Sequence, residues 1–324
     1  MRLLVTMKVN NEMADRISRL IGNRAAIDFL ARAEQGERKN LLESADIVLA
    51  MNFRKDIKEE EFPSLKNVKL IQLTLAGADG VPFDKLNARI LICSNGGAYS
   101  EPIAEHAIGM MLALARNFLP LHKKLSEGVF DQVTPHKMLM DSTLGIIGFG
   151  GIGKRTAEIA RGFGMKIIAI NSSGKTDTRI DFIGTLADLG MLLRESDFIL
   201  LTIALNKKTR GLIGRRELRM MKPDAVLVNV ARGELIDEKS LYDHLRAFPK
   251  FKAGIEAWWI EPFNFPRFEV HHPFFELDNF LGSPHNSYLT EGIHQKALDM
   301  ALENIMAFVK GEIPRNIQRR EDYV

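Results

Sequence analysis

The feature that most constrains the fold is a glycine turn in the middle of the chain. In "LGIIGFGGIGKRTAEIARGFGMKIIAIN", Gly148, Gly150 and Gly153 form the pattern G-x-G-x-x-G between an apolar run and a helical pattern, and a second apolar run follows. The first glycine permits a tight strand-to-helix turn, the second lets backbone approach a pyrophosphate, and the third lets helix and strand pack closely. We therefore predict a dinucleotide site with the helix N-terminus facing the pyrophosphate.

Two other interpretations of this stretch are weaker. A glycine-rich turn without a ligand explains a bare motif, but here the strand, helix and second strand stand in register. The letters "GFGGIGKR" also satisfy the G-x-x-x-x-G-K of phosphate-binding loops, but Arg155 stands where a Ser or Thr would hold Mg²⁺.

The end of the second apolar run indicates which dinucleotide is preferred. NAD sites carry an Asp or Glu about 20 residues beyond the turn, but Asn171 stands here, 23 residues after Gly148. The missing carboxylate removes a repulsion against a ribose phosphate, and Ser172, Ser173 and Lys175 can donate hydrogen bonds or positive charge to one. We predict a preference for NADP over NAD, with an ordinary surface turn as the alternative.

Apolar runs alternate with helix-favouring stretches along most of the chain, which predicts an α/β fold. The runs are continuous, as in parallel sheets covered on both faces. Two series of runs are separated by "EPIAEHAIGMMLALARNF", Glu101 to Phe118, whose apolar positions nearly encircle a helix. We expect this helix to be buried and the irregular stretch after it to cross into a second domain.

The composition limits the class of protein. A length of 324 residues predicts two domains, and a net charge of +3 without a basic face does not suggest nucleic acid as a partner. The single cysteine, Cys93, fits a reducing compartment. Because no apolar run reaches the roughly 18 residues of a membrane span and the start lacks a signal-peptide pattern, we expect a cytoplasmic protein with no membrane partner.

Three ionisable residues stand out in the second half of the chain. Arg232 lies in "NVARGELID", Glu261 29 residues later in "IEPF", and His285 24 residues further on in "GSPHNS". Each alone has an ordinary structural explanation. Their order, together with "LAGADG", "GAYSEPIAEHA", the glycine turn, "KKTRGLIGRREL" and "EAWWIEP", resembles the D-2-hydroxyacid dehydrogenase family over nearly the whole chain, and within it the glyoxylate and hydroxypyruvate reductases.

The resemblance implies two doubly wound parallel-sheet α/β domains with catalysis in the cleft between them. A Rossmann cofactor domain, expected at residues 118–286, would be inserted into a flavodoxin-like substrate domain of residues 1–117 and 287–324. A homodimer formed through the region around residues 101–140 is also implied.

The resemblance further implies site residues. Arg232 and His285 would bind the substrate, with backbone N–H groups of Ala76, Gly77 and Ala78 assisting at the carboxylate, and Glu261 would be the partner of His285, the acid–base group. The residues expected to contact the cofactor are Gly148, Phe149, Gly150, Gly151, Ile152, Gly153, Asn171, Ser172, Ser173, Lys175, Thr202, Ala204, Val230, Ala231, Arg232, Glu256 and His285.

The chemistry calls for these residue types independently. A guanidinium can grip a carboxylate with two parallel hydrogen bonds and polarise the adjacent carbonyl. After hydride arrives at that carbon, the oxygen must gain a proton, which a histidine supplies near neutral pH.

Two departures from the family pattern affect these expectations. Glu256 stands where relatives often carry an Asp that contacts the nicotinamide amide, and Ala204 stands where a proline is usual. Trp258 and Trp259 are expected to pack in the core, or else to wall the cleft. No metal is expected, because the adjacent His271 and His272 lack an acidic or cysteine cluster.

The leading hypothesis is an NADP-preferring reductase of small 2-oxo acids, of the glyoxylate or hydroxypyruvate type. The alternatives are a D-lactate-type or phosphoglycerate-type dehydrogenase, or a nucleotide-sensing corepressor of the same fold, whose main task is to bind protein partners.

Overall fold

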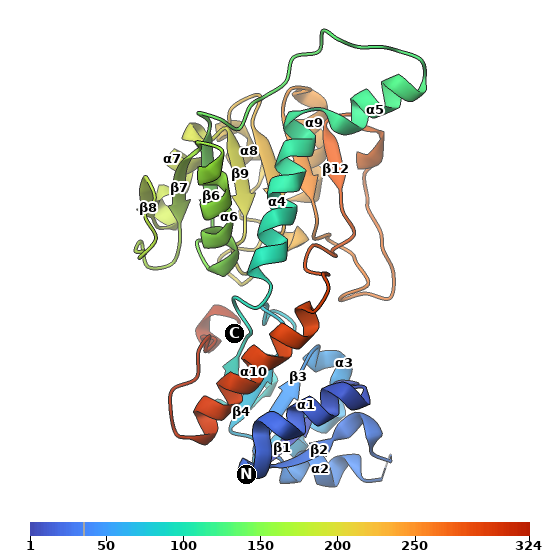
Figure 1. Ribbon diagram of the computed structural model, residues 1–324, viewed down its shortest axis with the longest axis vertical. Coiled ribbons are helices and arrows are strands. Elements are labelled where there is room, and N and C mark those ends of the chain that lie inside the picture. The colour runs from blue at the N-terminus through green and yellow to red at the C-terminus, as the bar shows by residue number, and fades with distance from the viewer. Residues whose placement is uncertain (35) are drawn as a thin grey trace. The chain divides into compact units, whose positions relative to one another are not determined.

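The computed structural model describes residues 1–34 and 36–324, which form two compact units (Figure 1). The first unit comprises Met1–Tyr99 and Thr290–Val324, and the second comprises Ser100–Leu289. The second unit is therefore inserted in the sequence of the first.

The first unit is built on a five-stranded parallel sheet with the order β2-β1-β3-β4-β5. This order is that of flavodoxin-like folds, as the resemblance implied. The strands are β1 (Arg2–Val5), β2 (Ala26–Phe29), β3 (Ile47–Ala50), β4 (Leu70–Leu73) and β5 (Leu91–Cys93).

Helices cover both faces of this sheet, and the chain returns to it at its end. On one face, Leu298 and Leu302 of the last helix pack with Leu3 and Ile17. Asn10 caps the first helix, since its Oδ1 accepts the N–H of Met13 at 2.8 Å. The helices of this unit are α1 (Asn11–Ile21), α2 (Arg38–Ser44), α3 (Phe53–Asp56) and α10 (Ile293–Val309).

The second unit contains a seven-stranded parallel sheet with the order β12-β11-β10-β9-β6-β7-β8. The chain runs outward in one direction from β6 through β7 and β8, and then in the other from β9 to β12. The switch point beside β6 is where doubly wound sheets bind ligands. The strands are β6 (Thr143–Ile147), β7 (Lys166–Ile170), β8 (Phe182–Gly184), β9 (Phe198–Leu201), β10 (Val226–Asn229), β11 (Lys252–Ile255) and β12 (Phe280–Gly282).

Both faces of this sheet are buried, which explains why its strands read as continuous apolar runs. Along β10, Val226 and Val228 belong to one core and Leu227 to the other, because successive side chains point to opposite faces. The helices are α4 (Ser100–Ala115), α5 (Phe118–Ser126), α6 (Gly151–Gly162), α7 (Leu189–Glu195), α8 (Arg215–Met220) and α9 (Glu238–Ala247).

Helix α4 places the boundary of the units elsewhere than expected. The expected domain of residues 1–117 and 287–324 included this helix, whereas its contacts place it in the second unit, against α6, β10 and β11. Its Ala107 and Met111 join the core that contains Ala157 and Ala160 of α6. The expectation that the helix is buried is confirmed. A helix that is apolar on all sides does not, however, indicate which of the two units it packs against.

The stretch expected to be irregular begins with a second helix, α5, and then runs without regular structure to β6. Figure 1 shows α5 and the following segment projecting from the body of the second unit. Across both described ranges, no helix combines the length and apolar character needed to cross a membrane.

Candidate active site

The predicted site residues follow the carboxyl ends of strands in the seven-stranded sheet. Gly148 comes directly after β6, Arg232 shortly after β10, Glu261 after β11 and His285 after β12. Since all these strands are parallel, their carboxyl ends lie along one edge of the sheet. The topology thus gathers these residues at the edge where such sheets bind nucleotides.

The glycine turn fits a pyrophosphate. Gly148 has a φ of 102°, and a Cβ there would lie 2.4 Å from the backbone nitrogen of Ile203. A Cβ on Gly153 would lie 2.6 Å from the carbonyl oxygen of Gly148, whereas one on Gly150 would meet nothing within 4 Å. Gly148 and Gly153 are therefore needed for packing, whereas Gly150 leaves open space before the first N–H groups of α6.

The other predicted cofactor loops lie at the same edge. Thr202 donates its hydroxyl to the carbonyl of Gly148 at 2.6 Å, which ties the end of β9 to the glycine turn. The carbonyl of the exposed Ala204 accepts the hydroxyl of Thr209 at 2.7 Å, so the loop is closed without the usual proline. Ala231 donates its N–H to Oδ1 of Asn229 at 3.0 Å. The side chains of Phe149 and Val230 are buried.

Asn171 shapes the loop after β7. Its Oδ1 accepts the N–H groups of Ser173 at 3.0 Å and Gly174 at 2.7 Å, and its Nδ2 donates to the carbonyl of Lys175 at 2.8 Å. The amide is thus built into the turn, and the side chains of Ser172, Ser173 and Lys175 are exposed. This geometry suits both the phosphate-binding interpretation and the ordinary turn.

His285 and Glu261 form a close pair. Nδ1 of His285 lies 2.6 Å from Oε1 of Glu261, and Oε2 of Glu261 accepts the N–H of Trp258 at 3.0 Å. The carboxylate is almost fully buried, while the His285 side chain keeps 18% of its surface exposed. A buried carboxylate on Nδ1 fixes the imidazole orientation and leaves Nε2 for another partner. We call these two residues the dyad.

Glu256 holds the turn that carries His285. It is fully buried, its carbonyl accepts the N–H of His285 at 3.1 Å, and its Oε1 accepts the N–H of Ser287 at 2.9 Å. His285 has a φ of 51°, in the left-handed region that side chains disfavour by about 1 kcal/mol or more. Oε2 of Glu256 has no hydrogen-bond partner among the described residues, so this buried atom could accept an N–H of a nicotinamide carboxamide.

Arg232 is positioned by a close approach of two backbone segments. A Cβ on the next residue, Gly233, would lie 2.3 Å from the carbonyl carbon of Trp258, so the turn after β10 packs directly on the segment that leads to Glu261. Asn229 donates its Nδ2 to the carbonyl of Arg232 at 2.7 Å. Arg232 is half-buried, and its Cζ lies 6.0 Å from the centre of the Phe263 ring.

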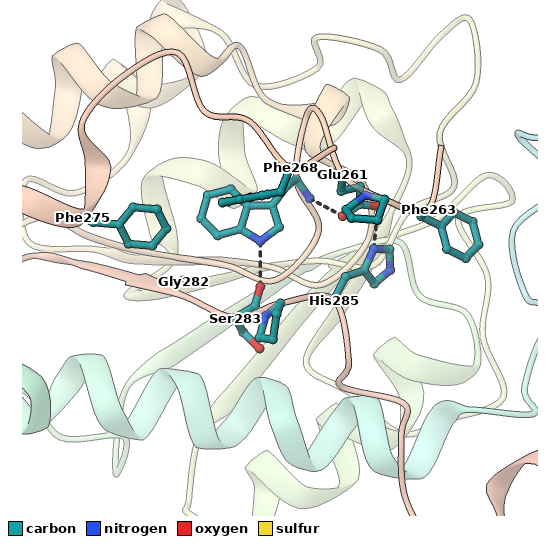
Figure 2. Close-up of a pocket in the computed structure, with 10 residues that line it drawn as sticks. Glu261, Phe263, Phe268, Phe275, Gly282, Ser283 and His285 are labelled. Atoms are coloured by element: carbon teal, nitrogen blue, oxygen red, sulfur yellow. Dashed lines mark hydrogen bonds and ion pairs between the residues drawn. The ribbon is translucent and has the colours of Figure 1, made fainter. Parts of the chain in front are cut away.

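An apolar pocket of about 450 Å³ adjoins the dyad (Figure 2). We call it the dyad pocket. Figure 2 shows Phe263 and Phe275 on opposite sides of the pair formed by Glu261 and His285. The ten residues that line it are Trp258, Glu261, Pro262, Phe263, Phe268, Phe275, Gly282, Ser283, Pro284 and His285.

The sequence did not identify this pocket or the place of Phe263. The aromatic residue directly after "IEP" was the one available signal, whereas Phe268 and Phe275 are gathered only by the folding of a long loop. Trp258 both packs in the core and lines the dyad pocket. It is 4% exposed, and its indole N–H donates to the carbonyl of Ser283 at 2.7 Å.

The loop predicted to assist at the substrate carboxylate belongs to the first unit. Ala76, Gly77 and Ala78 follow β4 in the first unit, and the Tyr99 hydroxyl, which donates to the carbonyl of Thr74 at 3.0 Å, braces the start of that loop.

The two histidines dismissed as metal ligands make surface contacts. His271 pairs with Glu238 at 2.8 Å, and the ring of His272 stacks on Tyr242. In residues 1–34 and 36–324, no three His, Cys, Asp or Glu side chains gather as a metal site would require.

A doubly wound parallel sheet, with a glycine turn at its switch point and a His–Glu pair at the same edge, defines a Rossmann-type dehydrogenase. Residues 108–287 match the family described as "D-isomer specific 2-hydroxyacid dehydrogenase, NAD binding domain". The chain belongs to this family of D-isomer specific 2-hydroxyacid dehydrogenases, and it is an oxidoreductase that uses a nicotinamide cofactor.

Relatives of known name agree with this assignment. The chain is 32% identical to a hydroxypyruvate reductase of Thermotoga maritima over 86% of its own length and 89% of that protein. It is 30% identical to a glyoxylate reductase of Thermococcus litoralis over 82% of this chain and 81% of that one. A D-lactate dehydrogenase of Aquifex aeolicus shares the fold, with a TM-score of 0.76 and 24% identity over 96% of each chain.

Proposed function

We propose that this protein reduces small 2-oxo acids of the glyoxylate or hydroxypyruvate type to D-2-hydroxy acids, with NADPH as the preferred cofactor. The observation that carries the proposal is the 2.6 Å contact between Nδ1 of His285 and Oε1 of Glu261, at the sheet edge that also bears Arg232 and the glycine turn. The names of the relatives from Thermotoga maritima and Thermococcus litoralis support this substrate type.

Each residue of the site has a separate task in this proposal. The guanidinium of Arg232 holds the substrate carboxylate through two parallel hydrogen bonds. Nε2 of His285 donates a proton to the carbonyl oxygen, and Glu261 keeps the imidazole oriented and balances the positive charge of its protonated form. When bound, the nicotinamide supplies the hydride.

The preference for NADPH rests on the loop after β7. No carboxylate stands at Asn171 to repel a ribose phosphate, and the exposed Ser172, Ser173 and Lys175 offer donors to it. The bonds of the Asn171 amide to Ser173, Gly174 and Lys175 hold the loop that presents these side chains.

A substrate panel tests the proposal. Oxidation of NADPH and NADH should be followed with glyoxylate, hydroxypyruvate, pyruvate and 3-phosphohydroxypyruvate. We expect turnover of glyoxylate and hydroxypyruvate, with a higher kcat/KM for NADPH than for NADH. Tight nucleotide binding without turnover of any acid would instead support a nucleotide-sensing corepressor.

We also propose that the protein is a homodimer joined through α5 and the segment that follows it. Several large apolar side chains are exposed there, namely Phe118, Leu119, Leu125, Val129, Phe130 and Val133, and exposed apolar groups of this kind mark interaction surfaces. Light scattering should show a dimer that Phe130→Glu combined with Val133→Glu converts to a monomer. Ile313→Glu, at an equally exposed position of the first unit, is the matched control. A monomeric parent protein would refute the proposal.

A further inference from the structure

The dyad pocket is larger and more apolar than glyoxylate or hydroxypyruvate requires. Its volume of about 450 Å³ lies within the ~300–1,000 Å³ typical of small-molecule sites, which are likewise lined mainly by apolar and aromatic side chains. Apart from the dyad and Ser283, its lining is aromatic, prolyl or glycyl. Gly282 allows Phe275 and Trp258 to pack close to the backbone at this side of the pocket, because a Cβ there would lie 2.9 Å from atoms of both side chains.

Phe263 links this pocket to the groups proposed to hold the substrate. Its ring centre lies 5.6 Å from that of His285 and 6.0 Å from Cζ of Arg232. A 2-oxo acid whose carboxylate is bound by Arg232 and whose carbonyl faces His285 lies within reach of this ring. The remaining substituent of the carbonyl carbon is the substrate side chain. Phe263 and His285 both line the dyad pocket, so this pocket adjoins the proposed position of the substrate.

We propose that the dyad pocket binds the side chain of the 2-oxo acid, and that the substrate class therefore extends to acids with branched aliphatic or aromatic side chains. This inference rests on the reductase activity proposed above. None of the ten residues lining the pocket in the described chain is Lys or Arg. A phosphorylated side chain would be left without a charge partner there, so 3-phosphohydroxypyruvate should be a poor substrate.

The first arm of the experiment compares substrates. 4-Methyl-2-oxopentanoate and phenylpyruvate should be reduced with a kcat/KM at least about tenfold above that for pyruvate, since even one added methylene in an apolar pocket gains roughly 10- to 200-fold. If glyoxylate and hydroxypyruvate are reduced but the apolar acids are not favoured over pyruvate, the inference is overturned and the proposed function stands. If no 2-oxo acid is reduced, the proposed function fails as well.

The second arm separates side-chain binding from support of the catalytic groups. Phe263→Ala should lower kcat/KM about tenfold for 4-methyl-2-oxopentanoate but less than about threefold for glyoxylate, which has no side chain. Phe263→Leu should restore most of the loss, because it returns apolar bulk. Phe265→Ala is the matched control, since Phe265 lies on the same loop but does not line the pocket, and should leave both values unchanged. An equal loss on both acids in Phe263→Ala would show that Phe263 only supports Arg232 and His285, and would overturn the inference.

Discussion

The N–H of His285 donates to the carbonyl of Glu256 at 3.1 Å, and the carboxylate of Glu256 accepts the N–H of Ser287 two residues further on. Glu256 thus holds both ends of the left-handed turn at His285. The carboxylate of Glu256 therefore stabilises the backbone of this turn in addition to facing the site.

Shortening Glu256 should loosen this turn. Glu256→Asp withdraws the acceptor from a buried N–H, which costs about 1–3 kcal/mol, so we expect a lower Tm and a kcat about tenfold below the parent. Glu256→Gln keeps an acceptor for Ser287 and should be the milder change. Steady-state kinetics and thermal unfolding of both variants provide the check, and a more active Asp variant would contradict the positioning role.

The glycine turn allows folding and cofactor binding to be separated. Gly150→Ala meets nothing within 4 Å, so its Tm should match that of the parent, while its Cβ occupies the approach of the pyrophosphate and should raise the Kd of NADPH by about tenfold or more. Gly148→Ala places a Cβ 2.4 Å from Ile203 at a φ of 102°, so it should lower the Tm as well. Fluorescence titration gives the Kd, and unchanged NADPH affinity in Gly150→Ala would speak against this site.

Asn171→Asp should move the cofactor preference toward NADH. The new carboxylate retains an acceptor for the N–H groups of Ser173 and Gly174. It loses only the bond from Nδ2 to the carbonyl of Lys175, so the turn should survive while a negative charge now repels a ribose phosphate. We expect the ratio of kcat/KM for NADPH to that for NADH to fall at least about tenfold. Asn87→Asp, which adds the same charge to a turn of the first unit, is the control. An unchanged ratio in Asn171→Asp would favour the ordinary-turn interpretation.

His244 should make the protein less stable in mild acid. Burial between Phe248 and Phe251 lowers the pKa of His244 from 6.5 to about 4. Between these values the unfolded chain binds a proton that the folded chain excludes, so stability falls as the pH drops from 6.5 toward 4, by up to about 3 kcal/mol. His244→Phe should flatten this dependence in denaturant titrations at several pH values. An equally steep dependence in the variant would assign the acid sensitivity to other groups.

Much of the fold could be predicted because its signals are local. Continuous apolar runs indicate strands buried on both faces. A position such as Gly148, with a positive φ and no room for a Cβ, requires glycine and can therefore be recognised in the sequence. The family resemblance implied that Glu261 is the partner of His285, and the structure brings the two side chains into contact. Their catalytic roles remain predictions.

What could not be predicted depends on how long segments fold back. The 23 residues between Glu261 and His285 do not reveal that Phe263 lies beside both His285 and Arg232, or that Phe268 and Phe275 help to line a pocket. The apolar pattern of α4 gave its burial but not its partner. The sequence also could not predict that Asn171 forms hydrogen bonds within its own turn. An asparagine that closes a turn and one that contacts a ribose cannot be told apart from the sequence.

The most direct test of the central claim is the kcat/KM of His285→Ala and Arg232→Ala with NADPH and glyoxylate, measured beside the Kd of NADPH. We expect each variant to lose about 10²- to 10⁴-fold in kcat/KM while the Kd stays within about threefold of the parent. His271→Ala, which removes a surface histidine paired with Glu238, should behave like the parent. Turnover close to that of the parent in His285→Ala or Arg232→Ala would contradict the proposed mechanism.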